Sequence, residues 1–229
     1  MDSERQERTA AVRVPIADQE LHGDLGIPAH PRGIVLFAHG SGSSRHSRRN
    51  QYVARALERR GLATLLIDLL TADEEAIDEQ TAEYRFDIDM LAERLVAVVD
   101  WLRRQAATKS LPIGLFGAST GGGAALVAAA ARPHDIAAVV SRGGRPDLAA
   151  AALPRVTSPT LLIVGGRDTD VIEVNRHARR QMRGEVVLDL VPGATHLFEE
   201  PGALEHVAEL AGDWFTQHLP PTLAPLAGR

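Results

Sequence analysis

The chain of 229 residues contains no cysteine, which excludes disulfide bonds, thiolate catalysis and cysteine-ligated zinc. No uninterrupted apolar run approaches the roughly 18 residues of a membrane span. The N-terminal segment is charged from its second residue and lacks the apolar core of a signal peptide. The net charge of −5 gives no indication of a polyanion-binding surface. We therefore expect a cytoplasmic protein that binds neither nucleic acid nor a membrane.

The composition is that of an ordinary globular protein, with 45% apolar and 24% charged residues. This length suits one sizeable domain with a buried core and is short for two. The first nine residues are polar, and the segment 219–229 carries three prolines. We predict a single domain at 10–219, acting as a monomer or homodimer, between flexible tails at 1–9 and 220–229.

Short apolar runs alternate with segments of helical period along most of the chain. The first two predicted strands flank a turn and form an antiparallel hairpin, whereas the later runs are apolar throughout, like parallel strands covered on both faces. The predicted strands are 10–16, 21–29, 33–40, 62–70, 111–119, 136–141, 160–166 and 185–193, and the predicted helices are 50–61, 86–105, 120–133, 171–184 and 202–219. This order predicts a doubly wound α/β fold, with a mostly parallel sheet of about seven to eight strands and helices on both faces.

Chemistry in such a sheet gathers at the carboxyl ends of the strands. One strand ends in Gly117-Ala118-Ser119-Thr120-Gly121, which matches the G-x-S-x-G nucleophile elbow. Its glycines allow a strand to turn abruptly into a helix with the serine in a strained conformation. Alternatively, the glycines allow close helix packing and Ser119 caps the helix. The glycine spacing fits no dinucleotide fingerprint, and no Lys-Ser or Lys-Thr follows it as in a P-loop.

A serine nucleophile requires a histidine to accept its proton and a carboxylate to orient that histidine. In chains with this elbow, both residues follow later strands. Asp168 and Asp170 follow the next-to-last predicted strand, and His196 follows the last. We predict a triad of Ser119, Asp168 and His196, because Asp168 is nearer the strand end. Asp170 is the alternative acid, Asp168 could instead cap the next helix, and His196 could be an ordinary turn residue.

The oxyanion formed during acyl transfer needs two N–H donors. One is expected at the backbone of Thr120, directly after the nucleophile, and the other in the loop that follows the strand 33–40. Within that loop we predict Ser41 as the second donor, with Gly42 as the alternative and as a candidate for substrate binding. The arginines of the segment 45–49 either bind an anionic substrate group or form a solvated basic loop.

Arg142 and Phe198 are two further candidates for substrate binding. Arg142 ends the strand that follows the elbow helix, and it points toward the predicted site. We expect it either to clamp a carboxylate or a loop at the mouth of the site, or to form an ion pair with Asp147, Glu199 or Glu200.

The segments HGSGSS, GASTG, GGRDTDV and GATHLFEEPG, in this order, resemble those of the α/β-hydrolase superfamily. The compact form resembles the dienelactone hydrolase branch, and the resemblance covers roughly residues 10–219. The segments HGSGSSRHSRRN and SRGGRPDL resemble a group of bacterial hydrolases that also occur fused to a phosphoribosyltransferase domain. Enzymes of this branch that open dienelactones use cysteine at the elbow. The resemblance therefore implies an α/β-hydrolase fold with serine esterase chemistry at Ser119.

Lids in this family usually enter after the strand that follows the elbow helix, and here the segment 142–159 has room for one short helix and no cap domain. We therefore predict an open site for small, soluble esters or lactones. The predicted enzyme is a carboxylic ester hydrolase that forms an acyl-enzyme on Ser119 and needs neither a metal nor an organic cofactor. The alternatives are a catalytically silent small-molecule binding protein of the same fold and a nucleotide-binding domain.

Overall fold

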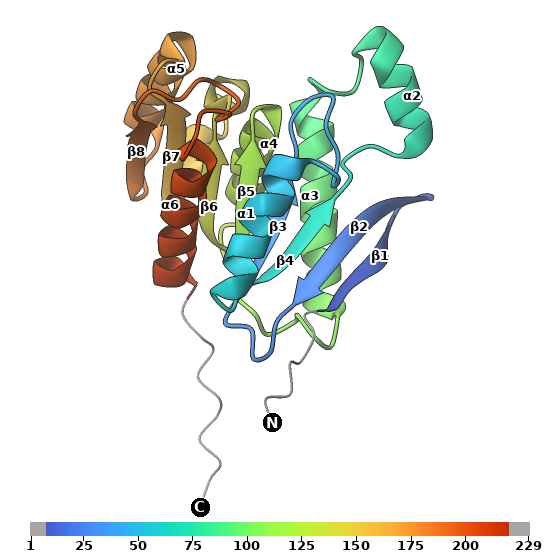
Figure 1. Ribbon diagram of the computed structural model, residues 1–229. Helices are drawn as coiled ribbons and strands as arrows, with labels where there is room; N and C mark the ends of the chain where they lie inside the picture. The colour runs from blue at the N-terminus through green and yellow to red at the C-terminus, as the bar shows by residue number, and fades with distance from the viewer. Residues whose placement is uncertain (1–7, 220–229) are drawn as a thin grey trace, which may run out of the picture.

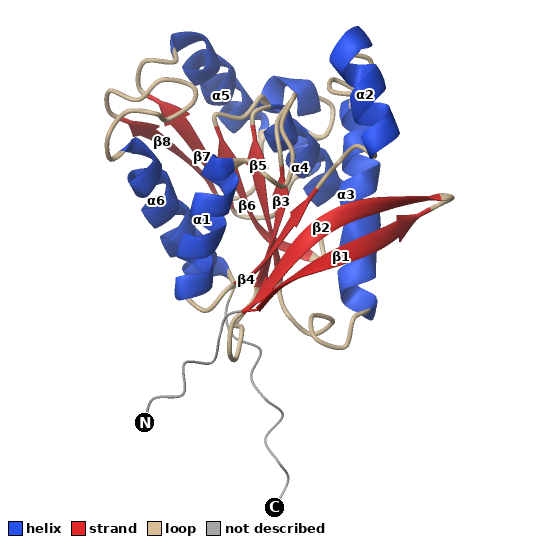
Figure 2. Ribbon diagram, turned by 45° about the vertical axis from the view of Figure 1, so that its right-hand side comes forward, coloured by secondary structure: helices blue, strands red, loops and turns tan. Residues whose placement is uncertain are grey.

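The computed structural model describes residues 8–219, and the strands in this range join a single mixed sheet (Figure 1, Figure 2). Residues 1–7 and 220–229 of the two predicted tails lie outside the described range. Arg8 and Thr9, which we predicted in the N-terminal tail, instead belong to the first strand, because they pair with Ile27 and Gly26.

The sheet has eight strands in the order β1-β2-β4-β3-β5-β6-β7-β8. β1 pairs antiparallel with β2, β2 pairs antiparallel with β4, and the remaining pairs are parallel. The strands are β1 (Arg8–Ile16), β2 (Gln19–Ile27), β3 (Ile34–Ala38), β4 (Ala63–Ile67), β5 (Ile113–Ala118), β6 (Ile136–Arg142), β7 (Thr160–Gly165) and β8 (Val186–Val191). The winding direction reverses between β3 and β5, where an open α/β sheet forms its crevice.

The central parallel strands are buried because helices cover both of their faces. β3, β4, β5 and β7 are buried at every position, in agreement with their continuous apolar sequences. β8 lies at the edge of the sheet, and Val191 is its one fully buried residue.

The helices form two layers, one on each face of the sheet. α1 and α6 pack together on one face, and α3, α4 and α5 pack on the other (Figure 1). The helices are α1 (Arg48–Arg59), α2 (Ala72–Thr81), α3 (Ile88–Arg104), α4 (Thr120–Ala131), α5 (Thr169–Gln181) and α6 (Ala203–His218). Each face of the sheet has its own apolar cluster, so the two layers enclose separate halves of the core.

The structure contains one α-helix, α2, that the sequence pattern did not predict. α2 is acidic, and Asp78 is its one buried residue. The helix stands at the margin of the molecule beside the upper end of α3 (Figure 1). The segment 142–159, which has room for one short helix by its length, forms two short 3-10 helices, Pro146–Ala149 and Leu153–Arg155, and holds no cap domain.

Candidate active site

The elbow between β5 and α4 holds Ser119 in the conformation that its motif predicts. Ser119 has φ 51° and ψ −121°, a strained backbone geometry for a residue with a side chain. A Cβ on Gly117 would lie 2.4 Å from the carbonyl oxygen of Gly121, so only glycine allows the turn to close. The backbone N–H of Ser119 donates to the carbonyl oxygen of Arg142 at 3.2 Å, which fastens the elbow to β6.

His196 and Asp168 come together from the loops after β8 and β7. Their Nδ1 and Oδ2 atoms lie 2.6 Å apart. Asp168 occupies the N-cap position of α5, but its side chain makes no capping hydrogen bond and turns to His196 instead. Asp170 lies in the first turn of α5 and is exposed. With a proton on Nδ1 facing the carboxylate, the Nε2 atom of His196 is the nitrogen left to accept a proton.

A hydrogen bond at Thr195 and packing of the His196 ring hold the loop that carries His196 in place. The carboxylate of Glu200 accepts the N–H of Thr195 at 3.1 Å, and hydrogen bonding from Thr195 lowers the pKa of Glu200 below its usual range. The ring packs against Gly143, where a Cβ would lie 3.5 Å from Nδ1 of His196. Gly144, next in the chain, is held in turn by the buried side chain of Asn175, which donates to its carbonyl oxygen at 3.0 Å.

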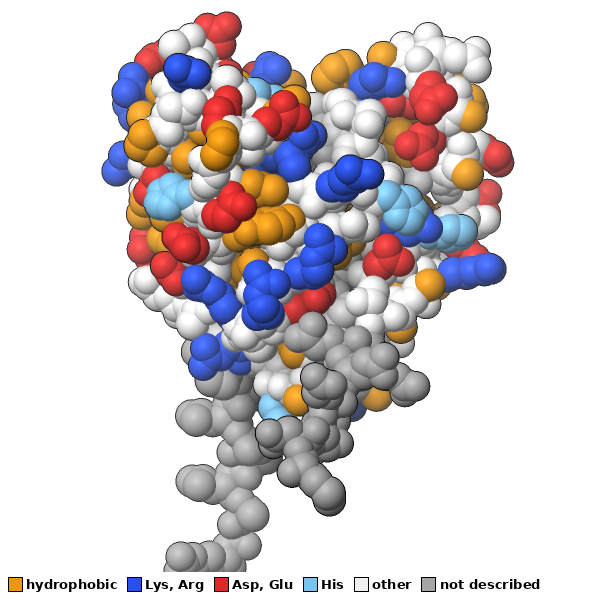
Figure 3. Space-filling model, viewed as in Figure 1, with side chains coloured by type: hydrophobic (Ala, Val, Ile, Leu, Met, Phe, Trp, Pro, Cys, Tyr) orange, Lys and Arg blue, Asp and Glu red, His pale blue; other side chains and the backbone are white. Residues whose placement is uncertain are grey.

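Ser119 and His196 line one cavity at the carboxyl edge of the sheet. Ala118, Arg142 and Leu197 also line it, together with residues of the loop after β3 and the start of α1. Figure 3 shows the molecule hollowed at this edge, between the lobe with α2 and the lobe with α5. Within residues 8–219 no hydrogen bond joins the Ser119 hydroxyl to His196, a contact that often tightens only around bound substrate.

The predicted oxyanion donors lie beside the elbow, and Ser41 is already engaged there. The N–H of Ser41 donates to the hydroxyl of Thr120 at 3.0 Å, and the two hydroxyl oxygens lie 3.1 Å apart. The N–H of Thr120 is at the first position of α4 and has no partner within that helix. Gly42, the alternative donor, has φ 63°. The Thr120 side chain, which the motif did not single out, therefore ties the loop after β3 to the elbow.

His39 anchors the start of that loop, next to the end of β3, and was also missed as a site residue. Its Nε2 accepts the N–H of Leu69 at 2.9 Å, while Nδ1 lies 2.9 Å from the carbonyl oxygen of Gly40. The ring is therefore neutral, with its proton on Nδ1. Burial lowers the pKa of His39, which keeps the ring neutral. The His-Gly pair at the strand end was the sequence signal that could have identified this role.

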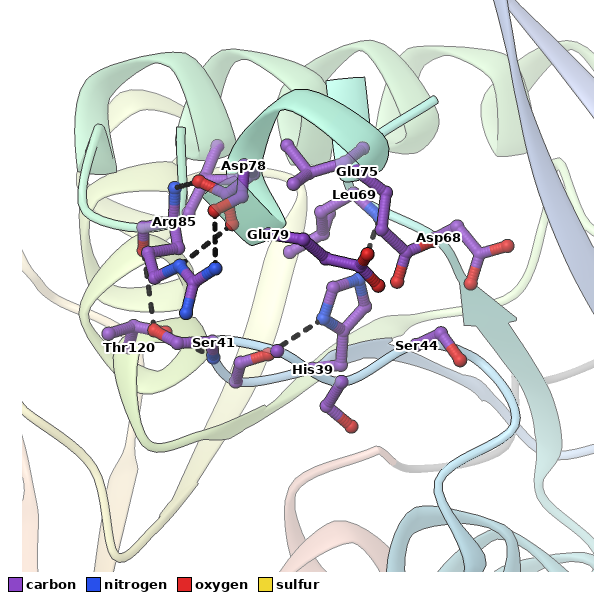
Figure 4. A pocket seen from close by; sticks show the side chains of 15 residues that line it. His39, Ser41, Ser44, Asp68, Leu69, Glu75, Asp78, Glu79, Arg85 and Thr120 are labelled. Carbon is purple, nitrogen blue, oxygen red and sulfur yellow. Dashed lines mark hydrogen bonds and ion pairs between the residues drawn. The ribbon is translucent and has the colours of Figure 1, made fainter. Parts of the chain in front are cut away.

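A second cavity lies on the α2 side of the loop 40–44 (Figure 4). His39, Ser41, Asp78, Glu79 and Arg85 line it, and the Asp78–Arg85 ion pair forms part of its wall. Burial raises the pKa of Asp78, but hydrogen bonds from the segment 84–85 outweigh burial and lower it overall. Neither Ser119 nor His196 borders this cavity, but Ser41, Gly42 and Thr120, the candidate oxyanion donors, do.

Arg142 contacts none of the acids that were proposed as its partners. Asp147 pairs with Arg145 at 2.6 Å, Glu199 pairs with Arg49 at 3.3 Å, and Glu200 bonds a backbone amide. The predicted ion-pair alternatives for Arg142 are therefore wrong, because each acid has a nearer partner.

Phe198, the other substrate-binding candidate, is a buried residue under the site. It is 2% exposed and does not reach the cavity lining. The guanidinium of Arg142 lies 5.7 Å from the centre of its ring. Phe198 therefore supports Arg142 from below.

The arginines of the segment 45–49 have different environments. Arg45 forms an ion pair with Asp68, Arg48 is exposed, and Arg49 lines the cavity that holds Ser119. The segment is therefore not uniformly solvated, and Arg49 is its one arginine that lines the candidate site.

Residues 8–219 contain no group of three or more His, Asp or Glu side chains arranged to hold a metal ion. In the same range, no helix is both long and apolar enough to cross a membrane.

The strand order and the elbow between β5 and α4 are those of an α/β-hydrolase. The chain belongs to this family, since the alpha/beta hydrolase domain family matches residues 31–210. The chain is also 58% identical to a dienelactone hydrolase from Anabaena variabilis ATCC 29413. The two structures superpose with a TM-score of 0.92, over 93% of this chain and 99% of that one.

Two other similarities differ in what they show. Est1E from Butyrivibrio proteoclasticus, also solved with ferulic acid bound, is 18% identical with a TM-score of 0.76, over 91% of this chain and 98% of its own, and shares the fold. Two Mycobacterium tuberculosis proteins, provisionally named phosphoribosyl transferases, are 57% identical over 219 residues, which is 92% of this chain and 48% of theirs. This chain thus spans about half the length of these curated relatives.

Proposed function

We propose that the protein hydrolyses small carboxylic esters or lactones through an acyl-enzyme on Ser119. The observation that carries this proposal is the 2.6 Å contact between His196 and Asp168, beside a serine held at positive φ in the same cavity. Core packing alone requires neither the His196–Asp168 contact, nor the positive φ of Ser119, nor their location together at the carboxyl edge of the sheet. A cofactor-independent enzyme fits this chemistry, because the triad supplies both the nucleophile and the base.

In the proposed mechanism, His196 accepts the proton of Ser119 as the hydroxyl attacks the carbonyl carbon. Asp168 orients the imidazole and stabilises its protonated form. The Thr120 N–H and either the Ser41 or the Gly42 N–H bind the oxyanion. Because the Ser41 N–H now donates to the Thr120 hydroxyl, its use requires that bond to be shared or released. His196 then protonates the leaving group, and the same base activates the water that cleaves the acyl-enzyme.

The absence of a cap domain between β6 and β7 supports small, soluble substrates. The segment there is limited to two short 3-10 helices, which leaves the Ser119 cavity open to solvent. We expect activity on p-nitrophenyl acetate and butyrate. With a lipid ester as substrate, we expect no rise in the hydrolysis rate at the concentration where the lipid begins to form an interface with water.

The first test compares the wild-type protein with Ser119→Ala on these two esters. We expect the substitution to lower kcat by about 10³-fold or more, because it removes the hydroxyl that forms the acyl-enzyme in the proposed mechanism. A fluorophosphonate probe should label the wild-type protein and leave Ser119→Ala unlabelled. Equal hydrolysis by the two proteins would contradict the proposal. A folded wild-type protein that neither hydrolyses esters nor reacts with the probe would instead be a silent binding protein.

The second test distinguishes the two candidate acids. Asp168→Asn should lower kcat by roughly 10²- to 10⁴-fold, because the asparagine cannot stabilise protonated His196. Asp170→Asn is the matched control and should retain wild-type activity, since Asp170 is exposed and the carboxylate that contacts His196 is that of Asp168. Equal losses in both variants would show that Asp168 has no special role.

A further inference from the structure

The turn after β6, residues 142–145, holds the backbone of Ser119 at both of its peptide groups. The N–H of Ser119 donates to the carbonyl oxygen of Arg142 at 3.2 Å, and the N–H of Arg145 donates to the carbonyl oxygen of Ser119 at 3.1 Å. This turn belongs to the SRGGRPDL segment of the sequence, to which the proposed chemistry assigns no role. The place of the candidate nucleophile therefore depends on where this turn lies.

The same turn contacts the candidate base and the strand that leads to the candidate acid. Gly143 has φ 52° and lies against the imidazole of His196, because a Cβ there would be 3.5 Å from both Nδ1 and Cε1. The N–H of Gly143 donates at 2.7 Å to the carbonyl oxygen of Ile163 in β7, the strand before Asp168. A shift of the turn would therefore change how the three members of the triad lie relative to one another.

Asn175 is the side chain that ties this turn to α5. Its amide nitrogen donates to the carbonyl oxygen of Gly144 at 3.0 Å and to that of Val171 at 2.8 Å. Both partners are acceptors, so the Nδ2 atom must face them, and both of its hydrogens are used. Asp168 is the N-cap of the same helix, about two turns before Asn175. One amide thus joins the turn that holds Ser119 to the helix that begins at Asp168.

Packing alone does not account for an asparagine at this position. Asn175 has no exposed surface and lies between Ile172 and Ala178 on the buried stripe of α5, where an apolar side chain would suit the core. Asparagine is a weaker helix former than leucine, and the Oδ1 atom of Asn175 is buried without a hydrogen-bond partner among residues 8–219. Burial of an unpaired polar atom lowers stability. These costs point to a role for the amide other than stability.

We propose that Asn175 is a positioning residue for the triad and acts through the turn 142–145. This inference rests on the proposed ester hydrolysis and adds to it a residue whose hydrogen bonds go to backbone carbonyls. While Asn175 holds the turn, the turn stays against the imidazole of His196 and stays bonded to Ser119. Proton transfer requires the hydroxyl and the imidazole to come within hydrogen-bond reach, and a displacement of about 1 Å can lower the rate about 10²-fold.

The kinetic test is Asn175→Leu, which keeps the number and branching of the side-chain heavy atoms and removes both donors. We expect kcat for p-nitrophenyl butyrate to fall about 10- to 100-fold, because the triad loses its alignment. KM should stay nearly unchanged, because Asn175 does not line the cavity that holds Ser119.

Thr108→Val is the matched control for Asn175→Leu. The Thr108 hydroxyl is fully buried and donates to the carbonyl oxygen of Leu102 at 2.7 Å. It lies between α3 and the start of β5, at the edge of the sheet opposite Ser119. Thr108→Val should also lower Tm, because it too removes a buried hydrogen bond, but it should leave kcat unchanged.

A second readout does not depend on turnover. The proton between Nδ1 of His196 and Oδ2 of Asp168, which lie 2.6 Å apart, should give a far-downfield signal in proton NMR. Asn175→Leu should shift or broaden this signal, and Thr108→Val should leave it unchanged. If Asn175→Leu does not fold, Asn175→Ser is the second variant. Its hydroxyl can still bond the carbonyl one turn back in α5 but is too short to reach the turn, so both effects should appear.

The combined outcomes assign each failure to one proposal. If the protein hydrolyses esters and neither Asn175 variant changes kcat or the NMR signal, the positioning role is overturned and the hydrolase stands. If Thr108→Val lowers kcat as much as Asn175→Leu does, the loss reflects stability and the positioning role is again overturned. If the wild-type protein hydrolyses no ester but its NMR signal changes in the Asn175 variants alone, the hydrolase is overturned and the positioning of His196 by Asn175 is supported.

Discussion

α4 and α2 flank the same loop, residues 40–44, but different forces hold the two helices in place. α4 is buried along most of its length and consists largely of glycine and alanine, so its backbone packs directly against the sheet. α2 is mostly exposed and acidic, and side-chain ion pairs and hydrogen bonds fix it. On one side of the loop, α4 is therefore held by close contact between main chains. On the other side, α2 is held by charged side chains.

This difference determines how each of the two helices responds to substitution. Close packing leaves no room for added atoms, so a single methyl group should be enough to disturb α4. An ion-paired helix tolerates added atoms on its exposed face but depends on the protonation of a few carboxylates. The predictions below test each dependence separately.

The largest expected effect is on α4, through Gly121→Ala. A Cβ at this position would lie 2.4 Å from the carbonyl oxygen of Ala38 and 2.5 Å from that of His39. Neither backbone atom can move without shifting β3, so we expect the free energy of unfolding to fall by about 3 kcal/mol or more. Urea denaturation followed by circular dichroism measures this change. Ester hydrolysis should fall as well, because the same shift moves the loop that begins at Gly40.

Gly61→Ala is the matched control for Gly121→Ala. Gly61 has φ 77°, but a Cβ there would have no atom within 4 Å. It should therefore cost only the backbone strain, about 1 kcal/mol, and leave hydrolysis unchanged. Gly121 is helical and has no positive φ, so backbone strain cannot account for a loss there. If Gly121→Ala loses no more stability than Gly61→Ala, the close-packing argument for α4 is wrong.

The next effect is on α2, through Glu74→Gln. Glu74 accepts from both guanidinium nitrogens of Arg94, at 2.7 and 2.6 Å, and Arg94 is only 8% exposed. Burial would raise the pKa of Glu74, but the hydrogen bonds from Arg94 and Thr71 and the charge of Arg94 together outweigh burial and hold the pKa at about 2. Removing the carboxylate leaves a buried cation without its counter-ion, so we expect a loss of about 2 kcal/mol at pH 7.

The same ion pair predicts an acid dependence with a definite sign. Because folding lowers the pKa of Glu74 from 4.5 to about 2, its contribution is complete above pH 4.5 and is lost as the pH falls toward 2. The stability gap between the wild-type protein and Glu74→Gln should therefore narrow across this range. Glu79→Gln is the control, since Glu79 is exposed and on the same helix. A gap that stays constant down to pH 2.5 would show that the charge on Glu74 does not stabilise the helix.

The contrast between the two helices also explains what could be predicted from the sequence. The strands and the helices packed on the sheet were predictable, because burial between layers imposes apolar runs and helical periods. The positions of Ser119, Asp168 and His196 could be proposed from the sequence, because a triad of the proposed kind requires these residues after particular strands. α2 gave no such signal, since Asp78 is its one buried residue and its anchors, Arg94 and Arg85, come later in the chain. The sequence places Arg142 at the carboxyl edge of the sheet. It does not show that Arg142 lacks an acidic partner, because that depends on how Asp147, Glu199 and Glu200 pair.

The smallest expected effect is at the start of α2, through Thr71→Ala. The Thr71 hydroxyl accepts the N–H of Glu74 at 3.3 Å, and Glu74 Oε2 accepts the N–H of Thr71 at 2.8 Å, which forms a capping box. Loss of the hydroxyl should cost about 1 kcal/mol, and Thr71→Ser should restore most of it. Because that Glu74 oxygen also accepts from Arg94, the cap positions one end of the ion pair. Thr71→Ala should therefore lower the free energy of unfolding less in a Glu74→Gln background than in the wild-type protein. If the two losses instead add to within about 0.3 kcal/mol, the cap and the ion pair act independently.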